Sequence, residues 1–562
     1  MSPLDHAQNR RFPFGADEDP RADLEFQTIP GLIDYAARAY REDLAIVCGL
    51  DDPGGPKRLT FAGLADEVAR VGRGLIALGV QPGESVAIWA PNCMEWALTA
   101  LAITSIGGVV VTLNTRFKGA EAAYILRTAK VRTLCTVEGF LGFDYPAMLV
   151  GEDLGELSSI VAMKGSPATL PEGTTVTSFD ALADRGRSVT EEEYEARRAA
   201  VHPDSTADLI FTSGTTGNPK GVATSHAQTL RTFGTWSTIV GLRHGDRYLI
   251  VNPFFHTFGY KSGLLASLMA GATIYPEPVF DLEIVGRHLQ SEAITVLPGP
   301  PTLFQSLLAG PDPVAVMGSL RLVVTGAAVV PVELVVELRD RIGAETVLTA
   351  YGLTESCGVV TMCRRGDAPD VIATTSGRAI PDVEVRCVDA QGNDVAPGEA
   401  GEIIVRGYNV MQGYFANEAA TAETIDENGF LHTGDVAIMD DAGNVIITDR
   451  LKDMYVVGGF NAYPAEIEAV LRRHPMVAQV AVVGVADDRM GEVGCAYVVP
   501  TGAPSDEVGR ELLAWSKAQM ANYKVPRYLV WTDALPLNAS GKVLKRELRS
   551  WFHAGRDPVV SN

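Results

Sequence analysis

Short β-rich runs alternate with helical segments over much of the chain, and this order constrains the fold more than any other feature. Apolar residues recur at helical spacing over Leu59–Val80, and compact apolar runs follow at Ser85–Ala90 and Gly108–Leu113. Such runs are typical of strands buried on both faces of a parallel sheet. Further runs end in Gly, Pro or a polar turn: Leu249–Val251, Thr295–Leu297 and Leu322–Thr325. The pattern predicts a doubly wound α/β body with its sites at the carboxyl ends of the strands.

The pattern changes after Gly377. Two strand-like runs, Val383–Val388 and Gly401–Val405, are separated by turn residues, which indicates a small antiparallel β-subdomain. Beyond residues 449–453 an α+β pattern begins, with helices predicted at Pro464–Arg473 and Glu511–Met520 and strands at Ala478–Val485 and Cys495–Val499. We therefore predict a large N-terminal domain over residues 1–449 and a small C-terminal domain over residues 450–562.

Length and charge narrow the class of protein. A chain of 562 residues is too long for one compact core, so more than one domain is expected. The formal net charge of −22 argues against nucleic acid or an anionic membrane as the main partner. It also means that a site for an anionic ligand must supply its own cations.

Cysteine usage and the N-terminal segment bear on location. The chain has 7 cysteines, an odd number, scattered and never spaced as Cys-x-x-Cys, which favours free thiols over disulfides or a zinc site. Residues 1–25 form a polar leader, predicted to be flexible, without the apolar run of a secretory signal. The longest apolar stretches, such as Gly263–Ile274, are too short to span a bilayer. We expect a cytoplasmic protein without stable membrane association.

The strongest local signal is a run rich in glycine and hydroxyl residues that directly follows the apolar run Leu209–Phe211. It reads Thr212-Ser213-Gly214-Thr215-Thr216-Gly217-Asn218-Pro219-Lys220-Gly221. Glycines and hydroxyls in a turn leave backbone N–H groups and side-chain donors free to surround an anion, and Lys220 adds a positive charge. A merely flexible polar loop is the alternative, but the position after a buried strand disfavours it. The run does not fit the Walker A pattern, so it indicates a phosphate-binding loop of another class.

This run resembles the signature of the adenylate-forming superfamily, which includes acyl-CoA ligases, firefly luciferases and the adenylation domains of peptide synthetases. The similarity continues in order along the chain through Pro91-Asn92, Glu95-Trp96, Asn252–His256, Tyr351–Glu355, Thr433–Asp435, Asp449–Asp453 and Ser540–Lys542. The resemblance implies a large α/β domain that binds AMP and a small C-terminal domain that moves.

Enzymes of this superfamily join a carboxylate to the α-phosphate of ATP, expel pyrophosphate, and then let the thiol of coenzyme A displace AMP. The resemblance therefore implies ATP, Mg²⁺, coenzyme A and a small carboxylic acid as ligands. It implies that Thr354 contacts the α-phosphate and that Glu355 and Thr216 hold Mg²⁺. The loop would bind the β- and γ-phosphates through Thr212, Ser213, Gly214, Thr215, Thr216, Gly217 and Lys220.

The resemblance also assigns the nucleoside contacts. Adenine would lie against Tyr351 and Gly352, with Gly326, Ala327 and Ala328 beside it. The two ribose hydroxyls would be bound by Asp435, whose carboxylate has two acceptor oxygens, with support from Arg450.

The remaining implied roles concern the acid and the second step. Lys542 would bridge the carboxylate and the α-phosphate during adenylation only, so the small domain would rotate between the steps about a hinge near residues 450–453. Lys452 has the hinge position, and Gly458 and Gly459 would line the pantetheine tunnel. His256 would act as a gate beside the acid and not as a general base, since the acid is already ionised at pH 7.

The acid is predicted from the residues near the gate. Small and apolar residues over Phe254–Ile274 and Pro298–Thr302 predict a roomy apolar pocket. Together with Gly326–Ala328 and Asp453–Asn461, these stretches are most similar to actinobacterial acyl-CoA ligases of alicyclic, polycyclic or terpenoid acids, while a long-chain fatty acid or an aryl acid stays open. Val456 stands where luciferases have a lysine, which disfavours a light-emitting reaction.

Three functions are alternatives to a complete two-step ligase. One variant would only convert a preformed acyl-adenylate to the thioester, with a separate adenylating enzyme as partner. Another would adenylate the acid and load a separate carrier protein. A non-enzymatic role is disfavoured because Lys220, Glu355, Asp435 and Lys542 are all present. A homodimer is compatible with the sequence.

Overall fold

The computed structural model describes residues 24–212, 219–326, 330–450, 453–457, 460–487, 489–520, 522–537, 542–553 and 560–561. The chain forms two compact units, one of Met1–Val385 with Val405–Leu431 and one of Arg386–Ile404 with His432–Asn562. Residues 1–23 of the predicted leader lie outside the described residues. The predicted functional boundary between residues 449 and 450 stays a prediction.

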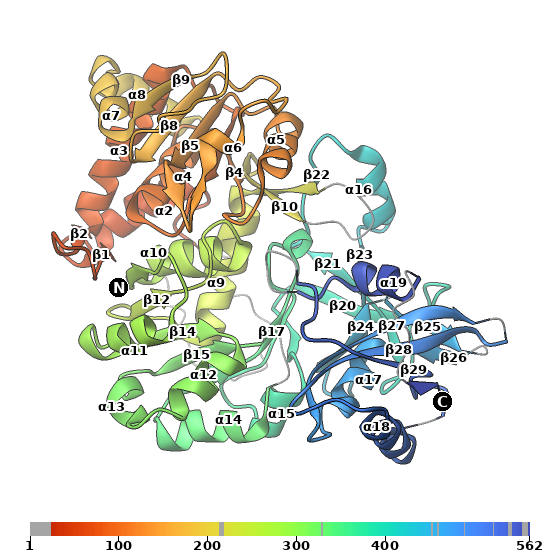
Figure 1. The fold of residues 1–562 in the computed structure, drawn as a ribbon. Helices are drawn as coiled ribbons and strands as arrows, with labels where there is room; N and C mark the ends of the chain where they lie inside the picture. Colours follow the sequence, from red (N-terminus) through yellow and green to blue (C-terminus); the bar gives the residue numbers. More distant parts are fainter. Residues whose placement is uncertain are drawn as a thin grey trace. The chain divides into compact units, whose positions relative to one another are not determined.

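An eight-stranded sheet forms one part of the first unit, in the order β22-β11-β10-β4-β3-β5-β8-β9. Neighbouring strands are parallel from β10 to β9 and antiparallel from β10 to β22. Figure 1 shows three helices beside this sheet: α3 (Phe61–Leu78), α7 (Phe179–Arg185) and α8 (Glu191–Ala199). The strands are β3 (Ser85–Trp89), β4 (Val109–Thr112), β5 (Thr133–Val137), β8 (Ser159–Lys164), β9 (Thr175–Ser178), β10 (Thr206–Thr212), β11 (Lys220–Ser225) and β22 (Gly413–Tyr414).

Helix α3 (Phe61–Leu78) shows why the sequence pattern predicted this layer well. The Thr60 hydroxyl accepts from the Gly63 N–H at 3.1 Å and caps the start of the helix. Gly79, with φ 104°, ends the helix in the left-handed conformation that glycine adopts most easily. The helix expected over Leu59–Val80 is therefore confirmed, and the buried strand expected next is β3.

A seven-stranded sheet forms the other part of the first unit, in the order β16-β15-β14-β12-β13-β1-β2. All neighbours are parallel except β1 and β2. Four helices lie beside it in Figure 1: α11 (Leu282–Ser291), α12 (Pro301–Leu308), α13 (Pro313–Met317) and α14 (Val332–Val336). Two mainly parallel sheets with helices confirm the predicted α/β fold class. The strands are β1 (Leu44–Cys48), β2 (Lys57–Thr60), β12 (Arg247–Ile250), β13 (Thr273–Pro276), β14 (Val296–Gly299), β15 (Leu322–Thr325) and β16 (Thr346–Leu348).

A buried helical segment accompanies these sheets. Helix α9 (His226–Val240) packs against a π-helix, η2 (Phe258–Leu265), which continues into α10 (Ala266–Ala270). The apolar stretch at Gly263–Ile274, noted above as too short for a membrane span, includes the end of η2, α10 and the start of β13. No described helix is long and apolar enough to cross a membrane.

Four strands between residues 383 and 450 form a separate sheet in the order β20-β21-β23-β24. Its strands are β20 (Val383–Val388), β21 (Ala400–Gly407), β23 (Leu431–Met439) and β24 (Val445–Arg450), and the first two confirm the predicted strands of the β-subdomain.

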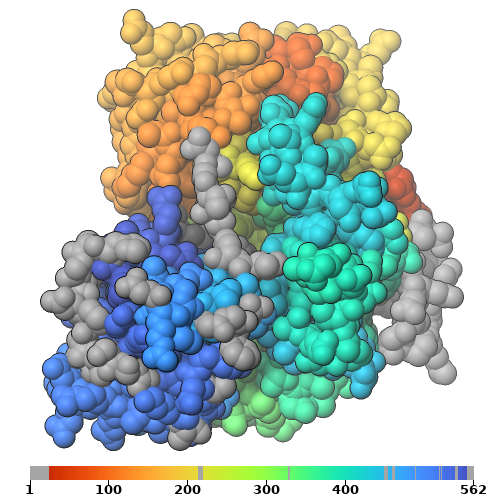
Figure 2. All heavy atoms as spheres, turned by 90° about the vertical axis from the view of Figure 1, so that its right-hand side faces the viewer, coloured from red at the N-terminus to blue at the C-terminus, as the bar shows by residue number. Residues whose placement is uncertain are grey.

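The end of the chain, drawn in blue in Figure 2, has its own core. Strands β27 (Val477–Asp487) and β28 (Gly491–Pro500) form a long antiparallel pair. Helix α17 (Pro464–Leu471) precedes this pair in the chain, and helix α18 (Asp506–Gln519) follows it. The predicted start of α18 at Glu511 is wrong. Ser505 caps the helix by accepting from the Val508 N–H at 3.2 Å, so the helix begins at Asp506.

Candidate active site

The hairpin of β10 and β11 holds the two ends of the predicted phosphate loop. Thr212, the last residue of β10, pairs across the antiparallel ladder with Lys220, the first residue of β11. A Cβ at Gly221 would lie 2.9 Å from the ring of Phe211, so only glycine fits there without a shift of the ring. The predicted loop residues between the strands lie outside the described residues: Ser213, Gly214, Thr215, Thr216 and Gly217.

Glu355 lies at the carboxyl end of β10. Its Oε1 accepts from the Thr212 hydroxyl at 3.4 Å and from the Tyr414 phenol at 3.0 Å. Its carbonyl accepts from the Met411 N–H at 2.9 Å, so backbone and side chain are both held. The structure therefore brings the predicted phosphate-loop residue Thr212 and the predicted metal ligand Glu355 into contact.

Tyr414 is a residue of this site that the sequence reasoning missed. It lies in β22, where it pairs with Val222 of β11. Burial raises the pKa of Tyr414, and the Glu355 carboxylate raises it further, so the phenol stays protonated and donates. Lys220 Nζ lies 4.7 Å from the centre of its ring, within range of a cation–π interaction. A lone tyrosine after a glycine has no sequence signal, because only the pairing of β22 with β11 brings it to the loop.

The predicted adenine and α-phosphate residues lie on a tight turn. Tyr351 is half-buried at the end of β17 (Ala350–Tyr351), and its carbonyl accepts from the Val360 N–H at 2.8 Å. A Cβ at Gly352 would lie 2.2 Å from the carbonyl oxygen of Gly358, so the turn closes only around a glycine. Thr354 follows, half-buried, in the 3₁₀ turn η4 (Thr354–Ser356).

Gly326 directly follows β15 and is half-buried. The neighbouring predicted residues Ala327 and Ala328 lie outside the described residues.

His256 follows β12 in a loop that is held by one side chain from the segment after β3 and one from β4. Asn92 donates to the Asn252 carbonyl at 2.9 Å and accepts from the Phe254 N–H at 2.6 Å. The Thr112 hydroxyl donates to the Phe255 carbonyl at 2.8 Å. His256 itself is exposed, and its backbone N–H donates to the Pro253 carbonyl at 3.0 Å, so the backbone that carries the imidazole is held.

Asp435 lies in the second unit, in β23, and is only 4% exposed. Glu402 fixes the residues before it: one carboxylate oxygen accepts from the Gly434 N–H at 3.0 Å, and the other lies 2.9 Å from His432 Nδ1. Gly434 has φ 67°, in the left-handed region. Glu402 is a second residue that the sequence reasoning missed.

Asp435 pairs with Arg450 in the ladder of β23 and β24. The side chain of Arg450 lies outside the described part of the structure, as do Lys452, Gly458 and Gly459.

Lys542 is exposed and comes shortly before helix α19 (Lys545–His553). Two ion pairs anchor that helix within the second unit. Lys545 Nζ lies 3.0 Å from Glu468 Oε1, and Arg549 Nη2 lies 3.3 Å from Oδ1 of Asp453, a residue of the predicted hinge. The exposed Lys542 ammonium is thus presented next to a fixed helix.

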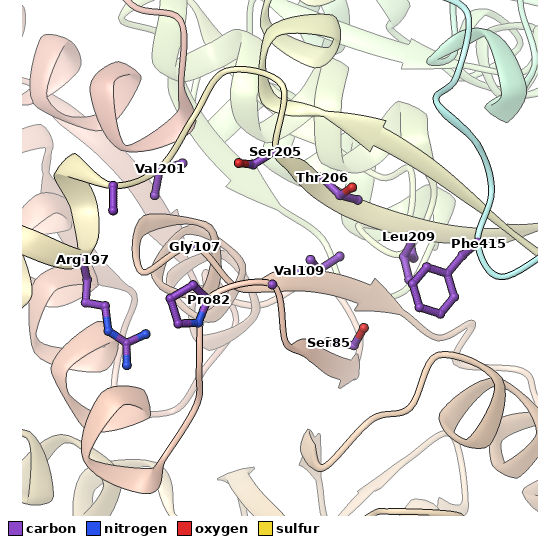
Figure 3. Close-up of a pocket in the computed structure, with 12 residues that line it drawn as sticks. Pro82, Ser85, Gly107, Val109, Arg197, Val201, Ser205, Thr206, Leu209 and Phe415 are labelled. Carbon is purple, nitrogen blue, oxygen red and sulfur yellow. The ribbon is translucent and has the colours of Figure 1, made fainter.

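Two cavities of the first unit lie at opposite ends of the eight-stranded sheet. The cavity in Figure 3, of about 310 Å³, is lined at the amino ends of β3, β4 and β10 by Ser85, Val109 and Thr206. A cavity of about 760 Å³ lies at the carboxyl ends, where Asn92 and Lys164 line it. Ligands of doubly wound folds bind at the carboxyl ends, so the larger cavity is on the functional side.

The residues around Glu355 fit a magnesium ion that arrives with a nucleotide. Among the described residues no group of three or more His, Cys, Asp or Glu side chains could hold a metal ion. Mg²⁺ in phosphate-binding enzymes is usually held by one or two carboxylates together with phosphates and water, all of them oxygen ligands. A single oriented carboxylate beside a phosphate loop meets that need.

Comparison with known proteins agrees with this arrangement. Residues 33–415 match the family described as AMP-binding enzyme, and residues 466–542 match the AMP-binding enzyme C-terminal domain. Two similar proteins are 3-[(3aS,4S,7aS)-7a-methyl-1,5-dioxo-octahydro-1H-inden-4-yl]propanoyl:CoA ligases. That of Rhodococcus jostii is 46% identical over 93% of this chain and 98% of its own length. That of Mycobacterium tuberculosis is 44% identical over 93% and 99%.

Two solved structures are similar over nearly the whole chain. An anthranilate CoA ligase in complex with anthranoyl-AMP has a TM-score of 0.79 and 26% identity, covering 93% of this chain and 97% of that one. The o-succinylbenzoate CoA synthetase of Bacillus subtilis, in complex with ATP and magnesium, has a TM-score of 0.75 and 28% identity, covering 92% and 98%.

Proposed function

The chain belongs to the AMP-binding enzyme family, and from that premise we propose that its acid is a propanoate carried on a fused alicyclic ring system. The protein is an AMP-forming acid:CoA ligase. A carboxylate oxygen of the acid attacks the α-phosphorus of ATP and pyrophosphate leaves. The thiol sulfur of coenzyme A then attacks the acyl carbon and AMP leaves.

One observation supports the choice of acid above the others. The two similar ligases that share 46% and 44% of their residues with this chain are named for the same octahydroindenyl propanoate. The residues around the gate suit such an acid, since η2 is largely apolar and buried and its Phe258 lies edge-on to Trp236 of α9, with ring centres 6.2 Å apart. A fused ring system is bulky and apolar, and apolar walls with few polar groups are what such a ligand needs.

For the first unit we propose the following roles. Residues 212–221 bind the β- and γ-phosphates, Glu355 and Thr216 hold Mg²⁺, Thr354 contacts the α-phosphate, and Tyr351 stacks on adenine. The hydrogen bond of 3.4 Å from Thr212 to Glu355 supports these two roles together, because a phosphate-binding residue and a ligand of the phosphate-bound Mg²⁺ must lie side by side. Lys220, beside Tyr414, supplies the cation that an acidic protein must provide for an anionic ligand. His256 gates the acid.

For the second unit we propose that Asp435 accepts from the ribose hydroxyls, with Arg450 in support, and that Lys542 bridges the carboxylate and the α-phosphate in the first step. The burial of Asp435 and the fixed turn before it support a preorganised acceptor. We propose the same functional boundary as above, with a hinge at residues 450–453 that includes Lys452, and with Gly458 and Gly459 lining the path of pantetheine. A cytoplasmic location and a homodimer remain predictions.

The test is to measure the two half-reactions separately on the full chain. Pyrophosphate exchange with ATP is measured over a panel of acids: octahydroindenyl and cyclohexyl propanoates, medium-chain and long-chain fatty acids, and aryl acids. Thioester formation from coenzyme A is measured with preformed adenylates of the same acids. We expect the highest kcat/KM in both assays with the fused-ring propanoate.

Three other outcomes are informative. Higher kcat/KM with a straight-chain or aryl acid would overturn the proposed acid. Thioester from adenylates without exchange for any acid would point to a separate adenylating enzyme. Exchange without thioester would point to a separate carrier protein as the acceptor.

A further inference from the structure

A buried ion pair that belongs to none of the roles above joins η2 to the hairpin of β10 and β11. Lys261, in η2, has its Nζ 3.0 Å from Asp208 Oδ1, and both side chains are 1% exposed. Lys261 also donates to the Thr224 hydroxyl at 2.7 Å and lies 3.6 Å from Cys357 Sγ. Lysine and aspartate are almost never buried this deeply unless they are paired.

Each partner of Lys261 belongs to a segment that carries a predicted site residue. Asp208 lies on β10, which ends at Thr212. Thr224 lies on β11, which begins at Lys220, and its hydroxyl donates to Asp208 at 2.7 Å. Cys357 directly follows the turn that contains Glu355. One ammonium group therefore joins both strands of the phosphate hairpin to the turn of the metal ligand.

The alternation of side chains along β10 explains how the Lys261–Asp208 ion pair fixes the turn that contains Glu355. Residues two apart on β10 share a face, so Asp208 and Thr212 point to the same side of the strand. Thr212 reaches Glu355 from that face, and Asp208, through Lys261, reaches Cys357 two residues further along the turn. The turn is thus held against β10 at two points, and a slide of the turn along the strand would break both.

Lys261 also belongs to the segment of the predicted gate. It lies five residues after His256, in the helix that begins two residues after that histidine, and the Tyr260 N–H of this helix donates to the His256 carbonyl at 3.0 Å. A Cβ at Gly259 would lie 2.1 Å from the Pro253 carbonyl oxygen, so this helix begins in close contact with the gate loop. π-helical segments are frequent at functional sites.

We propose that Lys261 is a positioning residue for the adenylation step, because it holds the acid-side segment of His256 and the ATP-side segments of Thr212, Lys220 and Glu355 in one register. At 1% exposure its ammonium does not meet the substrates, so it acts through those segments. The inference rests on the site roles proposed above. It adds that the acid side and the ATP side are coupled through one buried charge.

Stability and positioning are separable for such a pair. Removal of Lys261 alone leaves the Asp208 carboxylate buried, and its Oδ2 already has no hydrogen-bond partner in the described part of the chain. A single uncompensated buried charge is strongly destabilising, whereas replacing both partners by apolar side chains is often tolerated. A double variant therefore restores the fold without restoring the link.

The experiment compares Lys261→Met with the double variant Lys261→Met/Asp208→Leu in the full chain. Thermal unfolding, the kcat and KM of pyrophosphate exchange, and thioester formation from preformed adenylate are measured for each. We expect Lys261→Met to lower both the unfolding temperature and the kcat of exchange. We expect the double variant to recover most of the unfolding temperature while its kcat of exchange stays about 100-fold below that of the unaltered protein, as a misplacement of about 1 Å can cause. Thioester formation should fall less than exchange does in both.

A matched control is Arg321→Met, which breaks another buried ion pair of the first unit. Arg321 Nε donates to Asp246 at 2.7 Å, with the side chains 10% and 3% exposed, and neither residue belongs to the site. This variant should unfold at a lower temperature than the unaltered protein but keep the same kcat of exchange. If Lys261→Met does not fold, Thr224→Val keeps the ion pair but removes the two hydrogen bonds of the hydroxyl, to Asp208 and from Lys261. It should lower the kcat of exchange with a smaller loss of unfolding temperature than Lys261→Met.

Two results would overturn the positioning role while leaving the proposed function intact. In the first, the double variant recovers its stability and its kcat of exchange lies within about twofold of that of the unaltered protein, instead of about 100-fold below it. The other is Thr224→Val or Lys261→Met with unchanged exchange. Absence of exchange in the unaltered protein would instead overturn the proposed adenylation, and with it this inference.

Discussion

The phenol of Tyr414 donates a hydrogen bond of 3.0 Å to the carboxylate of Glu355, across 59 positions of the chain. Tyr414 comes from the edge strand β22 and Glu355 from the turn after β17, so neither local sequence indicates the other. The contact orients one carboxylate oxygen of the proposed Mg²⁺ ligand, and the second oxygen would be the one to hold the ion.

Tyr414→Phe should raise the Mg²⁺ concentration needed for half-maximal pyrophosphate exchange. Removing a partner that orients a metal ligand typically costs about 10-fold to 100-fold in metal affinity, and the phenylalanine ring keeps the contact with Lys220. A magnesium titration of the exchange rate measures the effect. Tyr408→Phe, which removes a phenol that donates to Thr235, is the control and should leave the titration unchanged. Equal titrations for Tyr414→Phe and the unaltered protein would show that Glu355 does not need this donor.

Gly352→Ala should disrupt the turn that presents Thr354 and Glu355. The added Cβ would lie 2.2 Å from the Gly358 carbonyl oxygen, and a backbone atom cannot yield as a side-chain end does. Overpacking of this kind costs about 1–3 kcal/mol, and here the shift falls on the site. We expect exchange to fall and the free energy of unfolding to drop in urea titrations. Gly366→Ala is the matched control, because a Cβ there meets nothing within 4 Å. Similar losses in both variants would contradict the steric argument.

The regular layers could be predicted from the sequence, because their signals are local. The strand predicted at Ser85–Ala90 is apolar throughout and is β3, and the helix predicted over Leu59–Val80 carries its own caps at Thr60 and Gly79. The start of α18 was predicted too late. Its first turn is mostly polar and so shows little apolar helical pattern, but the Ser505 hydroxyl caps the helix and starts it at Asp506.

The site was only partly predictable, because some of its residues meet through tertiary pairing. Thr212 and Glu355 stand in recognisable motifs, and the structure brings them together. Tyr414 and Glu402 stand in none, and each reaches its motif only through a neighbouring strand or turn. Lys261 was visible only as one residue of an apolar stretch, since a buried charge cannot be identified until its partner Asp208 is placed beside it.

Stability should depend on pH through His226, at the start of α9. The Ile29 N–H donates to its Nδ1 at 3.2 Å, and burial lowers the pKa of His226 to about 4 in the folded protein. An unfolded histidine has a pKa of about 6.5, so the unfolded state binds more protons between these values. The free energy of unfolding is therefore highest above pH 6.5 and falls as the pH drops towards 4, by about 3 kcal/mol at most.

Urea unfolding at pH 7, 6 and 5 measures this dependence. We expect His226→Gln to show a shallower decline than the unaltered protein, because glutamine does not titrate. His202→Gln is the control, since that side chain is 70% exposed, and its decline should match that of the unaltered protein. Parallel declines for all three proteins would assign the acid sensitivity to other groups.

Lys542→Ala should separate the two half-reactions. If the ammonium neutralises charge between the carboxylate and the α-phosphate, its loss removes stabilisation that the first transition state needs and the second does not. Pyrophosphate exchange should fall by about 100-fold or more, which is the usual cost of removing one such donor, while thioester formation from preformed adenylate stays within a few-fold. Lys517→Ala on α18 removes another exposed ammonium of the second unit and should change neither rate. Equal losses in the two assays would mean that Lys542 supports the fold or a step common to both, because a charge needed only for adenylation has no reason to slow the attack of a thiol on an adenylate already formed.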